Sequence, residues 1–279
     1  MQPRDDVATL KRGPTQLEYS QAVMNVGVNV ASFVALFFAL IVCLEAGRRS
    51  GRQAFGSGQA HPSGLGTVEA VTFGLLGLLL AFTFSGAAAR LDARRGQIVD
   101  EANAIGTAWL RLDVLPANAQ PKLRGAFRSY TDSRIAVYRT FSKSGLGAAQ
   151  AEYARSTALQ QEIWTEAVAA CRDVPSATVV LLPGLNAMFD IATTRQAATQ
   201  MHPPGVVYVV LALISLVCAF LVGYEMGATE VASRSHMIVL ALVLSFTFYV
   251  ILDFEYPRLG LIRIDDFDNL LIQVRASMG

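Results

Sequence analysis

The chain has 279 residues, of which 53% are hydrophobic and only 16% are charged, and its formal net charge is +1. A soluble domain of ordinary make-up could not bury so many apolar residues, so the composition favours a membrane protein. The Arg residues are dispersed, which argues against a nucleic-acid partner, because phosphate binding needs a concentrated patch of Lys and Arg.

Four apolar segments are each about as long as a helix that crosses roughly 30 Å of hydrocarbon. We predict transmembrane helices at residues 21–47, 67–89, 205–226 and 236–253. Residues 1–20 are expected to form an N-terminal segment rather than a signal peptide, because the first apolar run ends without a convincing cleavage site.

The remaining segments are predicted from turn residues and periodicity. Residues 48–66 are dense in Gly, Ser and Pro, which indicates a flexible loop. No Pro occurs from Ala87 to Leu115, so the second membrane helix should continue for several turns into water. Further helices fill residues 90–204, the last of them bent or interrupted near Pro183, and residues 254–279 form an amphipathic tail.

No alternating strand pattern occurs along the chain. We therefore predict an all-α polytopic membrane protein with four transmembrane helices and a helical extramembrane domain inserted between helices two and three. Four crossings place both termini and the inserted domain on one side. More Lys and Arg flank the membrane on that side, which predicts cytoplasmic termini in a bacterial inner membrane. Arg48, Arg49 and Arg52 in the first loop leave the periplasmic orientation as the alternative.

The second apolar segment carries two stripes at spacings of three and four residues. The small stripe, which we expect to allow close helix packing, consists of Gly74, Gly77, Ala81, Ser85 and Ala88. The bulky stripe consists of Phe73, Leu76, Leu80 and Phe84. Packing and lipid contact would explain both. The functional alternative makes this helix the lining of an oligomeric pore, with the bulky stripe as a hydrophobic constriction.

Charged residues lie at the ends of the predicted crossings. Repeated around a symmetry axis, Glu69 would form a ring of negative charge at the pore mouth and favour cations. A helix dipole would also explain an acidic residue in a first turn. At the other end, Arg90 and Arg258 are expected to form interfacial ion pairs with Asp253 and Glu255, because an unpaired carboxylate near hydrocarbon is costly.

Residues suited to catalysis or metal binding are few. His61, His202 and His236 have no Cys or carboxylate at metal-ligand spacing, and no phosphate-binding loop or nucleophile motif occurs. We therefore expect neither an enzyme nor a bound metal or cofactor. The expected partners are membrane lipids, further copies of the chain and inorganic ions.

Three stretches of the sequence carry a family resemblance. Residues 77–95 read GLLLAFTFSGAAARLDARR, residues 101–108 read EANAIGTA, and residues 252–263 read LDFEYPRLGLIR. Together with the order of two crossings, a helical block and two crossings, they resemble the bestrophin-like family of bacterial membrane proteins. The similarity extends over nearly the whole chain from about Ala22.

The resemblance implies an activity. Bestrophins are homopentameric ion channels with cytoplasmic helical domains, a pore lined by the second crossing helix and a hydrophobic neck, which Phe73, Leu76, Leu80 and Phe84 would supply here. Animal bestrophins bind calcium with the help of an acidic cluster after the last crossing. The comparable residues here, Asp265, Asp266 and Asp268, form a shorter cluster, so we expect no calcium site.

Two functions of different classes therefore remain. The first is a homo-oligomeric, bestrophin-like ion channel with a cation preference, most simply a pentamer. The second is a membrane-anchored sensor or scaffold, in which Tyr130, Tyr138, Tyr153 and Trp164 would include an exposed docking face. A transporter ranks third, because the four crossings lack an internal Pro or buried charge.

Overall fold

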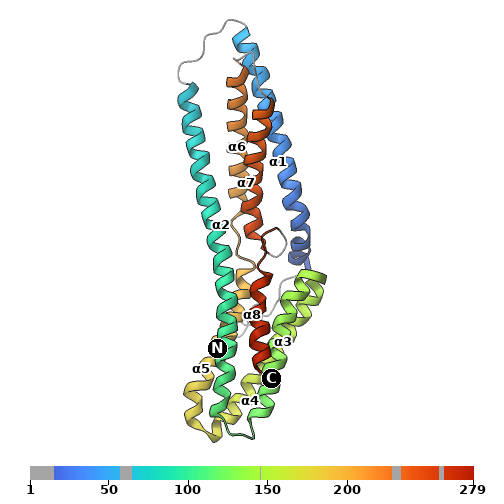
Figure 1. Ribbon diagram of the computed structural model, residues 1–279, viewed down its shortest axis with the longest axis vertical. Coiled ribbons are helices and arrows are strands. Elements are labelled where there is room, and N and C mark those ends of the chain that lie inside the picture. The colour runs from blue at the N-terminus through green and yellow to red at the C-terminus, as the bar shows by residue number, and fades with distance from the viewer. Residues whose placement is uncertain (1–15, 57–64, 145, 228–233, 258–260) are drawn as a thin grey trace, which may run out of the picture. The chain divides into compact units, whose positions relative to one another are not determined.

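A computed structural model of the chain describes residues 16–56, 65–144, 146–227, 234–257 and 261–279 (Figure 1). These residues are helical almost throughout and include no strand, which confirms the all-α class. The α-helices are α1 (Gln16–Gly56), α2 (Leu65–Leu110), α3 (Gln120–Ser144), α4 (Leu146–Asp173), α5 (Pro175–Ala198), α6 (Gly205–Gly227), α7 (Arg234–Glu255) and α8 (Asn269–Ser277). Two short 3₁₀ helices, η2 (Arg111–Val114) and η3 (Asp265–Asp268), precede α3 and α8.

Five of these helices are long and apolar enough to cross a bilayer: α1, α2, α5, α6 and α7. The sequence predicts four crossings, and α5 is the additional helix. Its mean hydropathy, 1.3, is lower than that of the other four, which ranges from 1.9 to 2.8. Long apolar helices of this kind make the chain an integral membrane protein.

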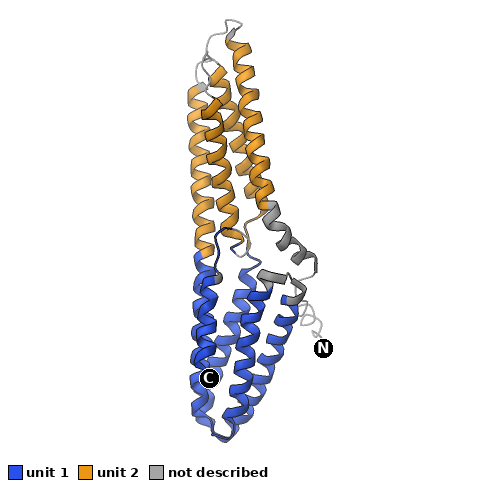
Figure 2. Ribbon diagram, turned by 45° about the vertical axis from the view of Figure 1, so that its right-hand side comes forward, with its two compact units in different colours: residues 1–25, 92–201, 257–279 blue, residues 26–91, 202–256 orange. Residues whose placement is uncertain are grey.

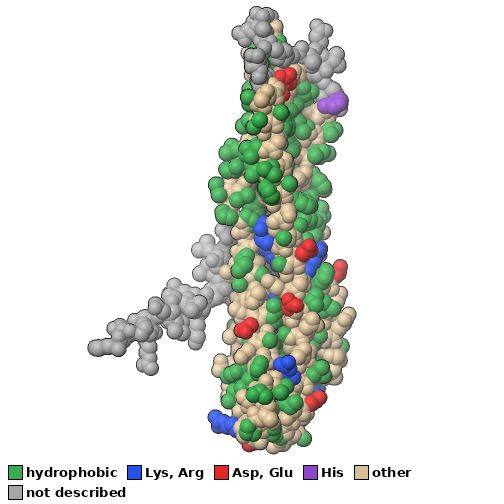
Figure 3. All heavy atoms as spheres, turned by 90° about the vertical axis from the view of Figure 1, so that its left-hand side faces the viewer, with side chains coloured by type: hydrophobic (Ala, Val, Ile, Leu, Met, Phe, Trp, Pro, Cys, Tyr) green, Lys and Arg blue, Asp and Glu red, His purple; other side chains and the backbone are tan. Residues whose placement is uncertain are grey.

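The chain divides into two compact units, coloured separately in Figure 2. Unit 2 consists of residues 26–91 and 202–256 and contains most of α1, the first part of α2, α6 and α7. Its core contains Leu40, Leu44, Leu211, Cys218 and Ile251. Large apolar side chains also cover much of its surface, among them Phe38 and Phe82 at 60% and 67% exposed. Figure 3 shows hydrophobic side chains over most of the visible part of this unit.

Unit 1 contains residues 92–201 and 257–279, together with residues 1–25. The amphipathic pattern of α3 explains its packing: Leu123, Phe127, Tyr130 and Val137 recur at helical spacing and are almost completely buried. Their partners include Ile105 of α2, Ile163 of α4, Leu181 and Met188 of α5 and Leu271 of α8. Among its described residues, this unit also buries four charged side chains: Arg94, Glu101, Arg134 and Arg195.

Two helices differ from the sequence prediction. The first helix, α1, continues to Gly56, into the segment predicted as the loop 48–66. The carboxylate of Glu45 accepts hydrogen bonds from Arg48 and Arg49, one turn further on, which stabilises the extra helical turns. Residues 57–64 of the predicted loop, and residues 1–15 of the predicted N-terminal segment, lie outside the described residues.

The second difference concerns α5, which remains one helix through Pro183. Arg111 donates from Nη1 to the carbonyl oxygen of Val180 at 3.0 Å and so supplies a side-chain hydrogen bond in the turn that the proline disturbs. The second helix agrees with the prediction: α2 passes residue 89, where the predicted crossing ends, and stays helical to Leu110. This agrees with the absence of Pro in that stretch.

Candidate functional site

The bulky stripe of α2 divides between the interior and the surface of unit 2. Leu76 is 3% exposed and belongs to the core, against which Phe73 and Leu80 pack as partly buried side chains. Phe84 is 41% exposed, and its ring lies 5.3 Å from that of Phe254. Within this chain the stripe therefore holds α2 against its own bundle, and Leu76 has little surface that could line a pore.

The small stripe of α2 faces away from the bundle. Gly74, Gly77, Ala81 and Ser85 are exposed, and Ala88 is partly exposed. A Cβ placed on Gly74 or Gly77 would have no atom within 4 Å, so no described helix packs closely against these glycines. Four large apolar residues share the exposed side of the helix: Val71, Leu75, Leu78 and Phe82. This outer face of α2, a mixture of small and bulky residues, is open to a second molecule or to lipid.

Close helix packing through glycine occurs elsewhere, between α1 and α6. A Cβ on Gly47 would lie 2.1 Å from the carbonyl oxygen of Phe220, and one on Gly223 would lie 2.1 Å from that of Leu44. Gly51 and Gly227 face the opposite helix with similarly little room. Both helices therefore carry a Gly-x-x-x-Gly pair, the small-residue spacing that allows membrane helices to approach backbone to backbone. The sequence contained this signal, but our prediction assigned packing to α2 alone.

Glu69, the predicted pore-mouth charge, lies in the first turns of α2 and is partly buried. Its Oε1 atom is buried without a hydrogen-bond partner among the described residues. Glu225 on α6 is close enough to act on it electrostatically. Two interacting carboxylates therefore lie at this end of unit 2, and their combined negative charge attracts cations.

A buried carboxylate occupies the other end of unit 2. Glu255, at the end of α7, is 1% exposed and accepts a hydrogen bond from Nε of Arg90 at 2.8 Å. Its other oxygen lies 3.4 Å from Nδ1 of His202, whose ring stacks on Tyr256 at 4.6 Å. Among the predicted interfacial residues, Arg90 and Glu255 thus form a pair. Asp253 is buried at 1% exposed and hydrogen-bonds with Tyr249, and Arg258 lies outside the described residues.

In unit 1, α2 carries a second buried carboxylate that the sequence analysis did not single out. Glu101 is fully buried and lies between two buried arginines, Arg134 of α3 and Arg195 of α5. Nε of Arg134 donates to Glu101 at 2.5 Å, and its Nη2 donates to the hydroxyl of Tyr138 at 2.6 Å. Arg195 also reaches Asp268 of η3, at 3.5 Å. The network thus joins α2, α3, α5 and the segment that precedes α8.

The charges in this network determine its protonation. Burial alone would raise the pKa of Glu101, but the positive charges of Arg134 and Arg195 and their hydrogen bonds outweigh it, so the pKa lies below the ordinary value of 4.5. For Tyr130, which lies beside the network, burial raises the pKa to about 12. At neutral pH Glu101 is therefore an anion between two cations and Tyr130 is neutral.

A further arginine connects α2 to α5. Arg94 is 8% exposed and donates to the carbonyl oxygens of Ala198 and Met201 at 3.3 and 3.1 Å. The last carbonyl groups of a helix have no partner within the helix, and an arginine satisfies them well.

Within the described residues, no group of three or more His, Cys, Asp or Glu side chains could hold a metal ion.

Comparisons with known proteins agree with the resemblance seen in the sequence. The Bestrophin-like domain profile matches residues 33–267. A crystal structure of a bacterial bestrophin homologue from Klebsiella pneumoniae, with one tryptophan replaced by alanine, is similar with a TM-score of 0.66 at 10% sequence identity. The alignment covers 89% of this chain and 96% of that one, which shows a shared fold. No curated protein matches the sequence. Because the domain profile spans most of its length, the chain belongs to the bestrophin-like family.

Proposed function

We propose that the chain is one subunit of a homo-oligomeric ion channel and that the outer face of α2 lines its pore. The observation that carries the proposal is this face: Leu78 and Phe82 are 53% and 67% exposed, while Gly74 and Gly77 beside them have no neighbour among the described residues. Membership of the bestrophin-like family supports an arrangement of several copies, most simply a pentamer, around one axis.

The proposed constriction differs from the one predicted from the sequence. Leu76 is part of the core of unit 2, so we do not assign it to the constriction. We assign the constriction to residues whose side chains are exposed in a single subunit. The proposed constriction consists of Leu75, Leu78 and Phe82, which share the outer face of α2. A ring of such side chains gates by dewetting, because water leaves a narrow apolar passage and ions do not enter without water.

A cation preference is the second part of the proposal. Glu69 lies on the side of α2 that interacts with Glu225, so these two carboxylates would act on ions at the pore mouth through their charge rather than by lining the passage. Acidic residues repeated around a pore favour cations over anions. The proposal also concerns the topology. We propose that α1, α2, α6 and α7 are the four membrane crossings, as predicted from the sequence, and that α5 is not a fifth. Helix α5 buries Leu181, Leu185 and Met188 in the core of unit 1, so it is proposed to lie in the cytoplasmic domain, on the same side as the termini.

The alternative of an anchored scaffold receives less support. It would need an exposed aromatic face on the helical domain, whereas Tyr130 and Tyr138 are 0% and 5% exposed and Tyr153 and Trp164 are partly buried. The four side chains belong to the core of unit 1 or pack against it, as the channel proposal requires.

Recording from the purified protein in planar bilayers tests the proposal. Replacing Leu78→Ala or Phe82→Ala should widen the constriction and raise the open conductance or the open fraction several-fold. Val217→Ala, an exposed valine on α6, is the matched control and should leave both unchanged. Absence of conductance in the wild type, or identical currents in all the variants, would refute the channel.

A further inference from the structure

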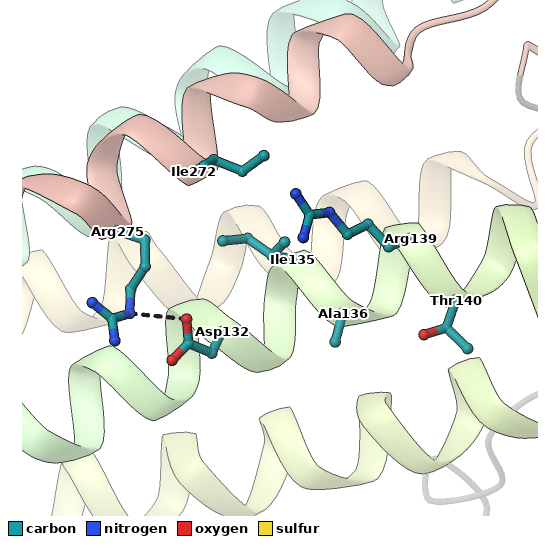
Figure 4. Close-up of a pocket in the computed structure, with 7 residues that line it drawn as sticks. All are labelled: Asp132, Ile135, Ala136, Arg139, Thr140, Ile272 and Arg275. Carbon is teal, nitrogen blue, oxygen red and sulfur yellow. Dashed lines mark hydrogen bonds and ion pairs between the residues drawn. The ribbon is translucent and has the colours of Figure 1, made fainter.

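Unit 1 contains a cavity between α3 and α8 whose chemistry the channel function does not use. Its volume is about 400 Å³, within the range of roughly 300–1,000 Å³ found for small-molecule sites. It is lined by Asp132, Ile135, Ala136, Arg139 and Thr140 of α3 and by Ile272 and Arg275 of α8 (Figure 4). The lining thus combines two guanidinium groups, one carboxylate and one hydroxyl with an apolar wall.

The two helices that form the cavity are held together by specific contacts. Nε of Arg275 donates to Asp132 at 2.9 Å. Arg128 donates from Nε and Nη2 to the carbonyl oxygen of Met278 at 3.0 and 2.9 Å. Leu271 and Met278 are buried at 0% and 2% exposed, so α8 is packed on α3 on one side while the cavity lies open on another. Both walls are therefore formed by ordered helices.

The charges around the cavity are not balanced. Asp132 is paired with Arg275, whereas Arg139 has no hydrogen bond or ion pair with any described residue. Two arginines and one carboxylate leave a single positive charge, which one negative charge on a ligand would neutralise. A doubly charged anion such as phosphate would leave the occupied cavity with a net negative charge. The guanidinium fork of Arg139 matches the two oxygens of a carboxylate.

The rest of the cavity is suited to hydrocarbon. In Figure 4 the side chains of Ile135 and Ile272 lie beside the guanidinium of Arg139, on the facing walls. An aliphatic chain placed against these two side chains would cover part of their apolar surface, which contributes about 25 cal/mol per Å² of buried apolar surface. The same cavity thus offers a partner for a carboxylate and an apolar surface for an aliphatic chain.

We propose that this cavity binds an aliphatic monocarboxylate, with its carboxylate on Arg139 and its chain between Ile135 and Ile272. The ligand would bridge α3 and α8 and so hold α8 more firmly in place. This inference is independent of the proposed channel function: a protein that conducts no ions would still bind the acid.

Calorimetric titration of the purified full-length chain with hexanoate tests the proposal. We expect saturable binding by the wild type, at least about tenfold weaker binding by Arg139→Gln because a charge-assisted pair is lost, and an intermediate affinity for Arg139→Lys. Arg172→Gln, an exposed arginine in the last turn of α4, is the matched control and should bind like the wild type. Amide exchange across residues 269–277 should slow when hexanoate is bound.

Two further probes separate head group from tail. Hexan-1-ol lacks the charge and inorganic phosphate lacks the chain, and both should bind at least about tenfold more weakly than hexanoate. A series of longer acids shows whether the natural ligand is a soluble acid or a fatty acid of the membrane. Affinity that stops rising with chain length once the cavity is filled indicates a soluble acid. Affinity that continues to rise indicates a fatty acid. Either result supports the site.

Three outcomes would overturn it. These are the absence of saturable hexanoate binding to the folded wild type, equal affinity in Arg139→Gln, or binding of phosphate or hexan-1-ol as tight as that of hexanoate. Elution volume and melting temperature of each variant verify that it is folded. Because Arg139 is exposed and unpaired among the described residues, its replacement should change neither.

Discussion

The two parts of α2 differ in what they bury and in what they expose. In unit 2 the helix buries Leu76 and leaves Leu78 and Phe82 mostly exposed. In unit 1 the same helix buries Ile98, Glu101 and Ile105 completely. Lipid is as apolar as a protein core, so helices in a membrane gain little by burying apolar side chains against one another. Their arrangement is fixed by close packing of complementary surfaces, as between α1 and α6. On the proposed topology unit 1 lies outside the bilayer, and there a buried charge that tolerates few alternative partners, such as Glu101, can fix the helices.

The buried charge of unit 1 provides the largest expected effect. Replacing Glu101→Gln leaves Arg134 buried without a counter-charge and leaves Arg195 with only the more distant Asp268, and breaking a buried ion pair in this way costs about 3–5 kcal/mol. The measurement is the free energy of unfolding in detergent, followed by circular dichroism in denaturant. Glu162→Gln, an exposed glutamate on α4, is the control and should change it by less than about 0.5 kcal/mol. Equal stability of the two variants would contradict the role given to the network.

The close packing of α1 and α6 gives the next largest effect, in unit 2. Gly47→Ala and Gly223→Ala each place a methyl group within 2.1 Å of a backbone oxygen of the other helix. Overpacking of this kind costs about 1–3 kcal/mol. Gly77→Ala is the matched control, since its methyl group meets no described atom. Thermal unfolding, monitored by loss of the gel-filtration peak, should occur at a lower temperature in both packing variants than in the control. An equal loss of stability in all three variants would contradict the close packing assigned to Gly47 and Gly223.

A smaller loss is expected at the end of unit 2, where one partner of the ion pair reaches solvent. The side chain of Arg90 is 34% exposed, whereas that of Glu255 is fully buried. Replacing Glu255→Gln should therefore cost about 1–2 kcal/mol, less than Glu101→Gln. The same denaturation experiment measures it. Asp92→Asn is the control, because it removes an exposed pair with Arg95 and should cost less than about 0.5 kcal/mol. A larger loss of stability in Asp92→Asn than in Glu255→Gln would contradict the greater contribution expected of the buried carboxylate.

The smallest expected effect is the pH dependence of the Glu101 contribution near neutrality. The pKa of Glu101 is lower in the folded protein than its ordinary value of 4.5, so its stabilisation is fully present above that value and is lost as the pH falls through the folded pKa. The stability difference between wild type and Glu101→Gln should change by less than about 0.5 kcal/mol between pH 8 and pH 6 and should shrink only in acid. A difference that shrinks steadily from pH 8 to pH 6 would show that the pKa of Glu101 is raised.

The helices themselves could be predicted from the sequence, because long apolar runs and an absence of Pro are local signals. Helix ends were less predictable. The continuation of α1 to Gly56 depends on Glu45 and on the contact of Gly51 with α6, neither of which the loop-like composition of residues 48–66 reveals. Pro183 was expected to bend or interrupt α5; the helix is not interrupted, and Arg111, distant in sequence, donates a hydrogen bond to the turn that contains the proline.

The faces of α2 could not be assigned correctly from periodicity alone. In a helix that is apolar all round, the bulky stripe fits a core, a pore and a lipid surface equally well, and only the packed bundle assigns Leu76 to the core. Glu101, Arg134 and Arg195 were missed for a different reason. They lie on three helices, and no spacing within one helix connects them.

The most direct test of the channel is the accessibility of single cysteines on α2 during current recording. The native thiols, Cys43, Cys171 and Cys218, are first replaced by Ala. A positively charged, water-soluble methanethiosulfonate reagent should then block the current through Phe82→Cys and Leu78→Cys and leave that through Leu76→Cys unchanged. Block at Leu76→Cys with none at Phe82→Cys would show that the opposite face of α2 lines the pore and would contradict the proposal.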